Sequence, residues 1–274
     1  MNRPIAFLLL LTYSLSACAP APENYTDLAS RVIEVANAQS IFIQVDHGEV
    51  TLLASDDSRV SIDGQVLFAD KLEYQVDSAE KQIAIKIFSH TDNLSKIPLM
   101  TVIRVPKNKQ VKVETDNASV LVRGYQGDVE IASTSGNIKL EKMMGRFTLR
   151  SNRGKVTIQE SSGVVSVVGN YGLLTLQSVR GEIAASTIMG NIAFSGLIQQ
   201  GDAVRLETDH GSVSVNLSAD SALTLQTRST SGDVTCLLPG VNSSTRTCDG
   251  EIRSGGGNLS IRTVSGTVML QLMP

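Results

Sequence analysis

The stretches Gly127-Asp-Val-Glu-Ile131, Gly136-Asn-Ile-Lys-Leu140 and Gly145-Arg-Phe-Thr-Leu149 begin a repeat that decides the fold. A glycine recurs every nine residues, at Gly127, Gly136, Gly145, Gly154, Gly163, Gly172, Gly181 and Gly190. In each unit the second and fourth residues after the glycine are apolar, and the first and third are mostly polar. Such alternation is typical of a strand with one buried and one solvated face. A short unit of this kind cannot bury its apolar face alone, so we expect the units to stack on one another.

The turns between the units show a second period, twice as long as the first. Ser133-Thr-Ser, Ser151-Asn-Arg and Gly169-Asn-Tyr alternate with Lys142-Met-Met, Glu160-Ser-Ser and Ser178-Val-Arg. Two alternating kinds of corner predict an all-β fold: a right-handed β-solenoid of about 18 residues per coil with two packed sheets. We expect each glycine to supply a positive φ, or the close backbone approach that a tight corner needs.

Outside the repeat the chain divides into further segments. We predict a signal peptide over residues 1–17, a tether over 18–30, an irregular N-terminal β region over 31–122 and the regular β-solenoid over 123–274. The segment Arg31–Val35 is predicted to be a strand, with the end of a short helix as the alternative. Residues 237–249 are expected to protrude as a loop, and the edge after Leu270 could pair with another chain.

The N-terminal residues resemble an export signal. Arg3 precedes an apolar stretch that is too short to span a bilayer, and Leu15-Ser16-Ala17-Cys18 resembles the cleavage site of bacterial lipoproteins. The resemblance implies lipid attachment at Cys18, and Ala19 implies sorting to the outer membrane if the source is Gram-negative. The alternative is an ordinary signal peptide with an incidental cysteine.

Cys236 and Cys248 remain as a pair in an exported chain. An oxidising compartment favours a disulfide between them. Two buried free thiols are the alternative, since Cys236 falls on an inward position of its strand. No metal site is expected, because two cysteines without a neighbouring histidine do not form a zinc-binding set.

Several motifs resemble one bacterial family. They are Val105-Pro-Lys107, Val111-Lys-Val113, Ser133-Thr-Ser-Gly-Asn-Ile138 and Ser229-Thr-Ser-Gly-Asp-Val234, and they are similar to the "putative adhesin" family of unknown function. The resemblance covers roughly residues 31–272 and implies the β-solenoid. It implies no cofactor and offers no catalytic residue.

Composition and residue spacing argue against nucleic-acid binding, calcium binding and catalysis. The chain has 24 Lys and Arg residues against 27 Asp and Glu residues, and it has no Trp. This composition gives no indication of a basic surface that would bind nucleic acid. The corners lack the paired glycines and aspartate of calcium-binding repeats. The acidic residues of the repeat are interpreted as solvated surface charge and not as a catalytic pair; they are Asp128, Glu130, Glu141, Glu160 and Glu182. The three histidines, His47, His90 and His210, are interpreted as turn residues.

The sequence therefore predicts a non-catalytic, lipid-anchored cell-envelope protein with a binding, adhesin-like or scaffold role. Its expected partners are the membrane, through the anchor, and an envelope glycan or protein. Two alternatives stay open: a carbohydrate-active enzyme on a solenoid scaffold, and an envelope stress or assembly factor. Apolar corner residues are expected either to pack against residues 31–122 or to form a partner surface; they are Met143, Met144, Val179, Leu197 and Ile198.

Overall fold

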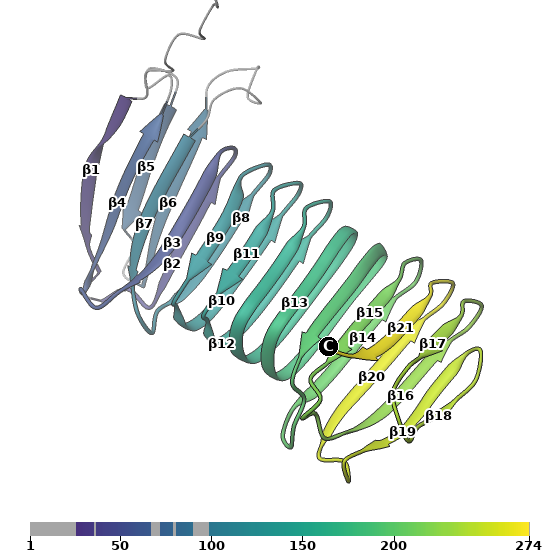
Figure 1. Cartoon of the computed structure of the whole chain (residues 1–274). Coiled ribbons are helices and arrows are strands. Elements are labelled where there is room, and N and C mark those ends of the chain that lie inside the picture. Colours follow the sequence, from purple (N-terminus) through teal and green to yellow (C-terminus); the bar gives the residue numbers. More distant parts are fainter. Residues whose placement is uncertain (1–25, 36, 67–71, 79–80, 90–98, 274) are drawn as a thin grey trace, which may run out of the picture.

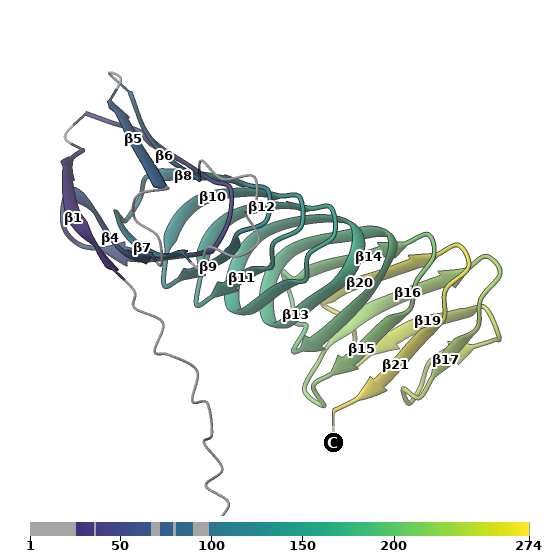
Figure 2. The same ribbon diagram turned by 90° about the horizontal axis from the view of Figure 1, so that it is seen from above.

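The computed structural model describes residues 26–35, 37–66, 72–78, 81–89 and 99–273. All elements within these ranges are strands, and they wind into a long flattened coil (Figures 1 and 2). No helix in the described ranges has the length and apolar character needed to cross a membrane. The Cys18 segment lies outside the described residues.

The middle of the chain stacks in parallel register with a period of two glycine units. Gly127 lies beside Gly145, and Gly145 lies beside Gly163 in the next coil. Each coil crosses one face of the rod, turns, and crosses the opposite face, so the all-β solenoid with two packed faces is confirmed. One strand, β13 (Val156–Gly196), is continuous over several of these crossings.

We call the two sides face A and face B. The strands of face A are β2 (Ser40–Val45), β6 (Gln82–Ser89), β8 (Gln110–Thr115), β10 (Gln126–Ser133), β12 (Met144–Ser151), β14 (Ala203–Thr208), β16 (Leu223–Ser229) and β20 (Gly257–Thr263). Those of face B are β3 (Glu49–Ser55), β7 (Leu99–Pro106), β9 (Ser119–Arg123), β11 (Ile138–Glu141), β15 (Val213–Leu217), β17 (Val234–Cys236) and β21 (Val268–Leu272). Segments of β13 complete both faces.

The core lies between the two faces and is mostly aliphatic. All sixteen apolar positions of the eight glycine units are buried, from Val129 to Phe194. Period-two alternation therefore sends every second side chain inward, as expected for strands packed on one side. The largest fully buried side chains are Tyr125, Phe147 and Phe194.

At both ends the coils are stacked out of chain order. Near the N-terminus, β2 pairs with both β6 and β8, and β3 pairs with both β7 and β9. Near the C-terminus, β20 lies between β14 and β16, and β21 lies between β15 and β17. The edge after Leu270 is therefore not free, which corrects the expectation that it could pair with another chain.

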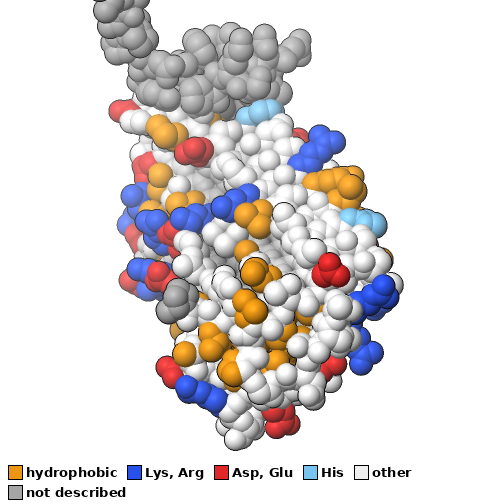
Figure 3. Space-filling view, turned by 45° about the vertical axis from the view of Figure 1, so that its right-hand side comes forward, with side chains coloured by type: hydrophobic (Ala, Val, Ile, Leu, Met, Phe, Trp, Pro, Cys, Tyr) orange, Lys and Arg blue, Asp and Glu red, His pale blue; other side chains and the backbone are white. Residues whose placement is uncertain are grey.

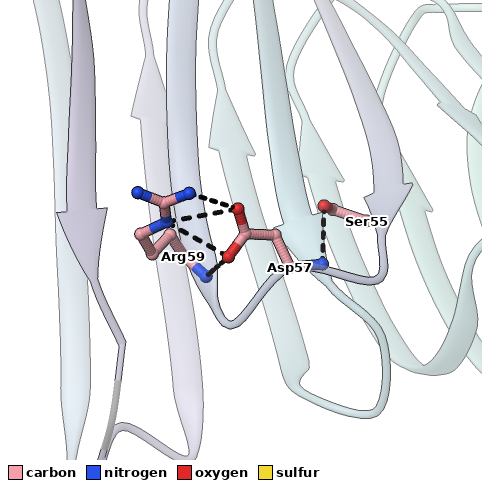
Figure 4. Close-up of polar contacts among 3 residues, drawn as sticks. All are labelled: Ser55, Asp57 and Arg59. Atoms are coloured by element: carbon pink, nitrogen blue, oxygen red, sulfur yellow. Dashed lines mark hydrogen bonds and ion pairs between the residues drawn. The ribbon is translucent and has the colours of Figure 1, made fainter.

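Antiparallel strands cover the two ends of the parallel stack. They are β1 (Thr26–Glu34), β4 (Arg59–Val66) and β5 (Leu72–Ser78) at one end, and β18 (Asn242–Ser243) and β19 (Thr247–Ile252) at the other. The expected protruding loop at 237–249 thus contains an edge hairpin, with β19 paired to β16. At the β3–β4 turn, the Ser55 hydroxyl accepts from the Asp57 N–H, and the Arg59 guanidinium pairs with the Asp57 carboxylate at 2.8 Å (Figure 4). These bonds fix the turn at which the chain leaves the parallel stack.

The expected segment boundaries differ from the structure in two places. β1 begins at Thr26, so residues 26–30 of the expected tether are strand, and Arg31–Glu34 are strand rather than helix. Position 122 falls inside β9, and β8 already pairs with β10 in the register of the regular coils. Within the region 31–122, β2, β3 and β6 to β9 are therefore stacked in parallel with the solenoid, whereas β4 and β5 pair antiparallel at its end.

Three of the five apolar corner residues, which were expected to pack against residues 31–122 or to form a partner surface, are instead part of the hydrophobic core. Met143, Val179 and Ile198 are 1–2% exposed, whereas Met144 is 58% exposed. Lys142 and Ser178 have positive φ, at 55° and 53°, and the backbone turn after each places the next side chain in the core.

Candidate functional site: a polar groove along one corner

The turn from face A to face B, which we call the serine corner, is built by buried hydroxyl groups. The Ser133 hydroxyl donates to the Gly136 carbonyl at 3.0 Å, and the Ser151 hydroxyl donates to that of Gly154 at 3.1 Å. Further along the stack, the Thr208 hydroxyl donates to the Gly190 carbonyl at 3.1 Å. Because such bonds recur along the stack, the corner has a fixed shape and the residue after each hydroxyl points to solvent.

The predicted glycines divide between two corners. Gly136, Gly154, Gly172 and Gly190 lie at the serine corner, and Gly127, Gly145, Gly163 and Gly181 lie at the second corner, over residues 142–145 and their equivalents. All four at the second corner have positive φ, between 110° and 143°. At the serine corner only Gly172 has positive φ, so Gly136, Gly154 and Gly190 serve close approach instead.

An open groove of about 420 Å³ runs beside the serine corner. Its wall includes one residue from each of five successive coils, in the order Asp46, Asp116, Thr134, Asn152 and Asn170. Neighbouring coils are about 4.8 Å apart. We call this set the corner row.

Hydrogen bonds link members of the corner row along the rod. The Thr134 hydroxyl donates to Asp116 Oδ1 at 3.3 Å, and Asn170 Nδ2 donates to Asn152 Oδ1 at 3.0 Å. Each amide and hydroxyl keeps further donor or acceptor capacity for solvent or a ligand. The row therefore offers regularly spaced, neutral hydrogen-bonding groups at one end and carboxylates at the other.

The acidic end of the row is electrostatically coupled. Burial raises the pKa of Asp46, the neighbouring Asp116 raises it further, and His47 opposes the increase. His47 Nε2 lies 3.1 Å from Asn117 Nδ2, while its Nδ1 is buried without a hydrogen-bond partner among the described residues. Burial and the neighbouring Asp116 thus both disfavour the charged form of Asp46.

An apolar patch follows the corner row toward the C-terminal end. Val168, Tyr171, Ile188 and Met189 are each 45–55% exposed. Figure 3 shows hydrophobic side chains between the two pale-blue histidines along this edge of the molecule. The second described histidine, His210, contacts the Ser265 hydroxyl through Nδ1 at 2.6 Å; His90 lies outside the described residues.

Most acidic residues weighed from the sequence are paired with cations on the surface. Glu130 pairs with Arg150, Glu141 with both Arg123 and Lys139, and Glu160 with Lys142. No described group of three or more His, Cys, Asp or Glu side chains could hold a metal ion.

The structure joins Cys236 on β17 to Cys248 on β19 by a disulfide. Cys248 is fully buried and Cys236 is half-buried. Because β17 belongs to face B and β19 pairs antiparallel with β16 of face A, the bond connects the last coil of face B to the edge of face A. It lies far along the chain from the corner row and has a structural role.

The corner row was not among the sites predicted from the sequence. Asp116, Thr134, Asn152 and Asn170 recur in the sequence at the coil period, so aligning the coils at the serine corner brings them into one column. Asp46 has no such signal, because β2 joins the stack out of chain order.

Comparisons with known proteins bear on the family and the fold. The family model described as Toastrack DUF4097 matches residues 32–271. Similar solved structures include a "putative cell adhesion protein" from Clostridium sporogenes (10% identity, TM-score 0.32, 91% of this chain and 100% of that one). A "putative adhesin" from Bacteroides fragilis is also similar, with 10% identity and a TM-score of 0.45 over 90% of this chain and 97% of that one. A "putative adhesin" from Parabacteroides distasonis has 10% identity and a TM-score of 0.27 over 91% of this chain and 98% of that one. No curated protein matches the chain.

Proposed function

The chain belongs to the Toastrack DUF4097 family, and on this basis we propose that it is a non-catalytic binding or scaffold protein of the bacterial cell envelope. The observation that carries the proposal is the corner row in its open groove. A row of hydroxyl and amide groups with one fixed spacing suits a linear ligand that repeats its own polar groups, such as an envelope glycan.

Binding is tested with the chain from residue 19 onward, which contains every described strand and lacks Cys18. The immobilised chain is exposed to polysaccharides and proteins from the envelope of the source bacterium. We expect capture of a ligand and at least about tenfold weaker binding by the variant Thr134→Ala/Asn152→Ala/Asn170→Ala, because several hydrogen bonds are lost.

The matched control is Lys142→Ala/Glu160→Ala, which alters exposed residues of the second corner. The control should bind like the wild type. No captured ligand, or equal binding by the groove variant, would overturn the proposal.

The proposal includes an outer-membrane lipid anchor at Cys18, supported by the signal-like sequence before it. Cells fed a palmitate analogue should label the wild-type chain but not Cys18→Ala. A labelled Cys18→Ala variant, or an unlabelled wild type, would reject the anchor.

One observation favours a second candidate, a carbohydrate-active enzyme. Asp46 and Asp116 directly follow the adjacent strands β2 and β8, and the pKa of Asp46 is raised, as in a general acid. Against this, the two carboxylates lie side by side in one row, whereas glycoside hydrolysis needs carboxyl groups flanking the scissile bond.

The two functions are separated by incubating the chain with captured polysaccharide and measuring new reducing ends. Cleavage that disappears in both Asp46→Asn and Asp116→Asn would establish the enzyme. Binding without cleavage supports the non-catalytic role.

A further inference from the structure

A second open groove lies on face A near the C-terminal end, away from the corner row. It has a volume of about 620 Å³ and is formed by the outward side chains of β14, β20 and β16. Glu207, Arg262 and Arg228 lie side by side on the three strands, and Arg205, Ser260 and Gln226 form the parallel row two residues earlier.

The charges in this groove are not balanced. Arg205 pairs with Glu207 at 2.7 Å along the same strand. No hydrogen bond or ion pair connects the guanidinium of Arg228 or Arg262 to another described side chain, and both residues are exposed. Three arginines and one glutamate give the groove a formal charge of +2, in a chain whose net charge is −3.

Two acidic groups lie beside the two arginines without forming an ion pair with either. Glu207 lies opposite Arg262, but its carboxylate pairs with Arg205. Asp249 on the neighbouring strand β19 lies opposite Gln226, and its carboxylate accepts from the Thr227 N–H at 3.0 Å. Thr247, not an acid, lies opposite Arg228. Like charges on neighbouring strands destabilise a sheet, and a bound anion between Arg228 and Arg262 would remove that repulsion.

The lining indicates what kind of anion fits. A guanidinium is a planar fork that binds carboxylate, sulfate or phosphate with two parallel hydrogen bonds. Gln226, Ser260 and Thr247 add an amide and hydroxyls that suit the hydroxyls of a sugar. The one apolar lining residue, Ile261, is buried, so the groove lacks the apolar anchor typical of protein interfaces and the aromatic platforms that stack on nucleobases.

We propose that this groove binds an anionic polysaccharide, with Arg228 and Arg262 holding one acidic group and the polar side chains holding adjacent sugar hydroxyls. The site is distinct from the corner row and does not depend on it. It gives the rod a charge-selective surface near its C-terminal end.

The test measures binding of the chain from residue 19 onward to polygalacturonate and dextran sulfate by calorimetry at low salt. We expect roughly tenfold weaker binding for Arg228→Gln or Arg262→Gln and roughly a hundredfold for the double variant. Arg153→Gln, an exposed arginine at the serine corner, is the matched control and should bind like the wild type. Thermal unfolding of each variant checks that the fold is retained.

Neutral dextran and polyglutamate complete the design. Binding to both acidic polysaccharides but to neither of these two supports the site, and so does its retention in Thr134→Ala/Asn152→Ala/Asn170→Ala. Equal binding to polyglutamate would overturn the sugar component. Undiminished binding by the folded double arginine variant would overturn the site itself, whatever the outcome for the corner row.

Discussion

Gly145 lies so close to Gly127 in the preceding coil that a Cβ on Gly145 would overlap the Gly127 carbonyl group. The same relationship joins Gly163 to Gly145 at the second corner and Gly154 to Gly136 at the serine corner. The repeated glycines therefore form two columns along the rod, in which each backbone occupies the space that a side chain on the next would need.

Alanine substitutions should separate the two reasons why these positions need glycine, which are the positive φ and the lack of space for a Cβ atom. Gly145 has a φ of 139° and no space, so Gly145→Ala should lower the free energy of unfolding by about 2–4 kcal/mol. Gly154→Ala, which meets only the steric overlap, should cost about 1–3 kcal/mol. Gly240 has positive φ but open space, and Gly240→Ala should cost about 1 kcal/mol. Urea denaturation measures all three, and a smaller loss for Gly145→Ala than for Gly240→Ala would contradict the column.

The buried Thr227 hydroxyl has no hydrogen-bond partner among the described residues. Thr227→Val should raise the free energy of unfolding by about 1 kcal/mol, because a buried hydroxyl without a partner costs desolvation. Thr208→Val is the matched control: it removes a hydroxyl that donates to Gly190, and it should be destabilising. Equal effects of the two substitutions would show that Thr227 has a partner.

The pH dependence of stability should reveal the raised pKa of Asp46, which burial and then the neighbouring Asp116 cause. The pKa of Asp46 is raised in the folded chain, so its stability contribution is full below its ordinary pKa of 3.8 and is lost as pH rises through the folded pKa. Asp46→Asn should therefore be more stable than the wild type at pH 7, by less than about 1 kcal/mol, with no difference near pH 3.

Asp57 provides the control of opposite sign for that experiment. Hydrogen bonds from Arg59 lower the pKa of Asp57, so its contribution is present above 3.8 and is lost as pH falls. Asp57→Asn should be less stable than the wild type at pH 7. Denaturant titrations at both pH values check the two signs, and a destabilised Asp46→Asn at pH 7 would contradict the raised pKa of Asp46.

Reduction of the disulfide should loosen the C-terminal end first. Cys236 and Cys248 are 12 residues apart, and a bond closing a loop of this size stabilises by roughly 3 kcal/mol in the chain-entropy model. We expect the variant Cys236→Ala/Cys248→Ala to lose about this amount of unfolding free energy. Relative to the wild type, its hydrogen exchange should accelerate more in β17 and β19 than in β12. Uniformly faster exchange along the rod would instead indicate that the stack unfolds as one unit.

The regular repeat made much of the fold predictable. The glycines and the alternation from Val129 to Phe194 fix strand positions, inward faces and coil length, because the same local pattern recurs at one period. The order of the terminal coils is different, since pairing of β2 with β8, or of β20 with β14, depends on contacts between segments distant in sequence. Burial of Met143 was missed because it depends on the positive φ of Lys142, which the residue type does not signal.

The same contrast applies to the candidate sites. The regular spacing from Asp116 to Asn170 is visible in the sequence, so the corner row could have been predicted from it. The neighbouring positions of Arg228 and Arg262 were not available, because β20 reaches β16 only after the chain has formed the β18–β19 hairpin.

The structural unit of the solenoid spans two glycine repeats and contains two unlike corners. Deleting residues 145–162 joins Met144 to Gly163, which is in register with Gly145, the residue that normally follows Met144, and the shortened chain should fold with a cooperative urea transition. Deleting residues 145–153 instead exchanges the serine corner with the second corner in all later coils, and that chain should not fold. Cooperative unfolding of the first variant alone is the predicted result; equal folding of both, or folding of the nine-residue deletion alone, would contradict it.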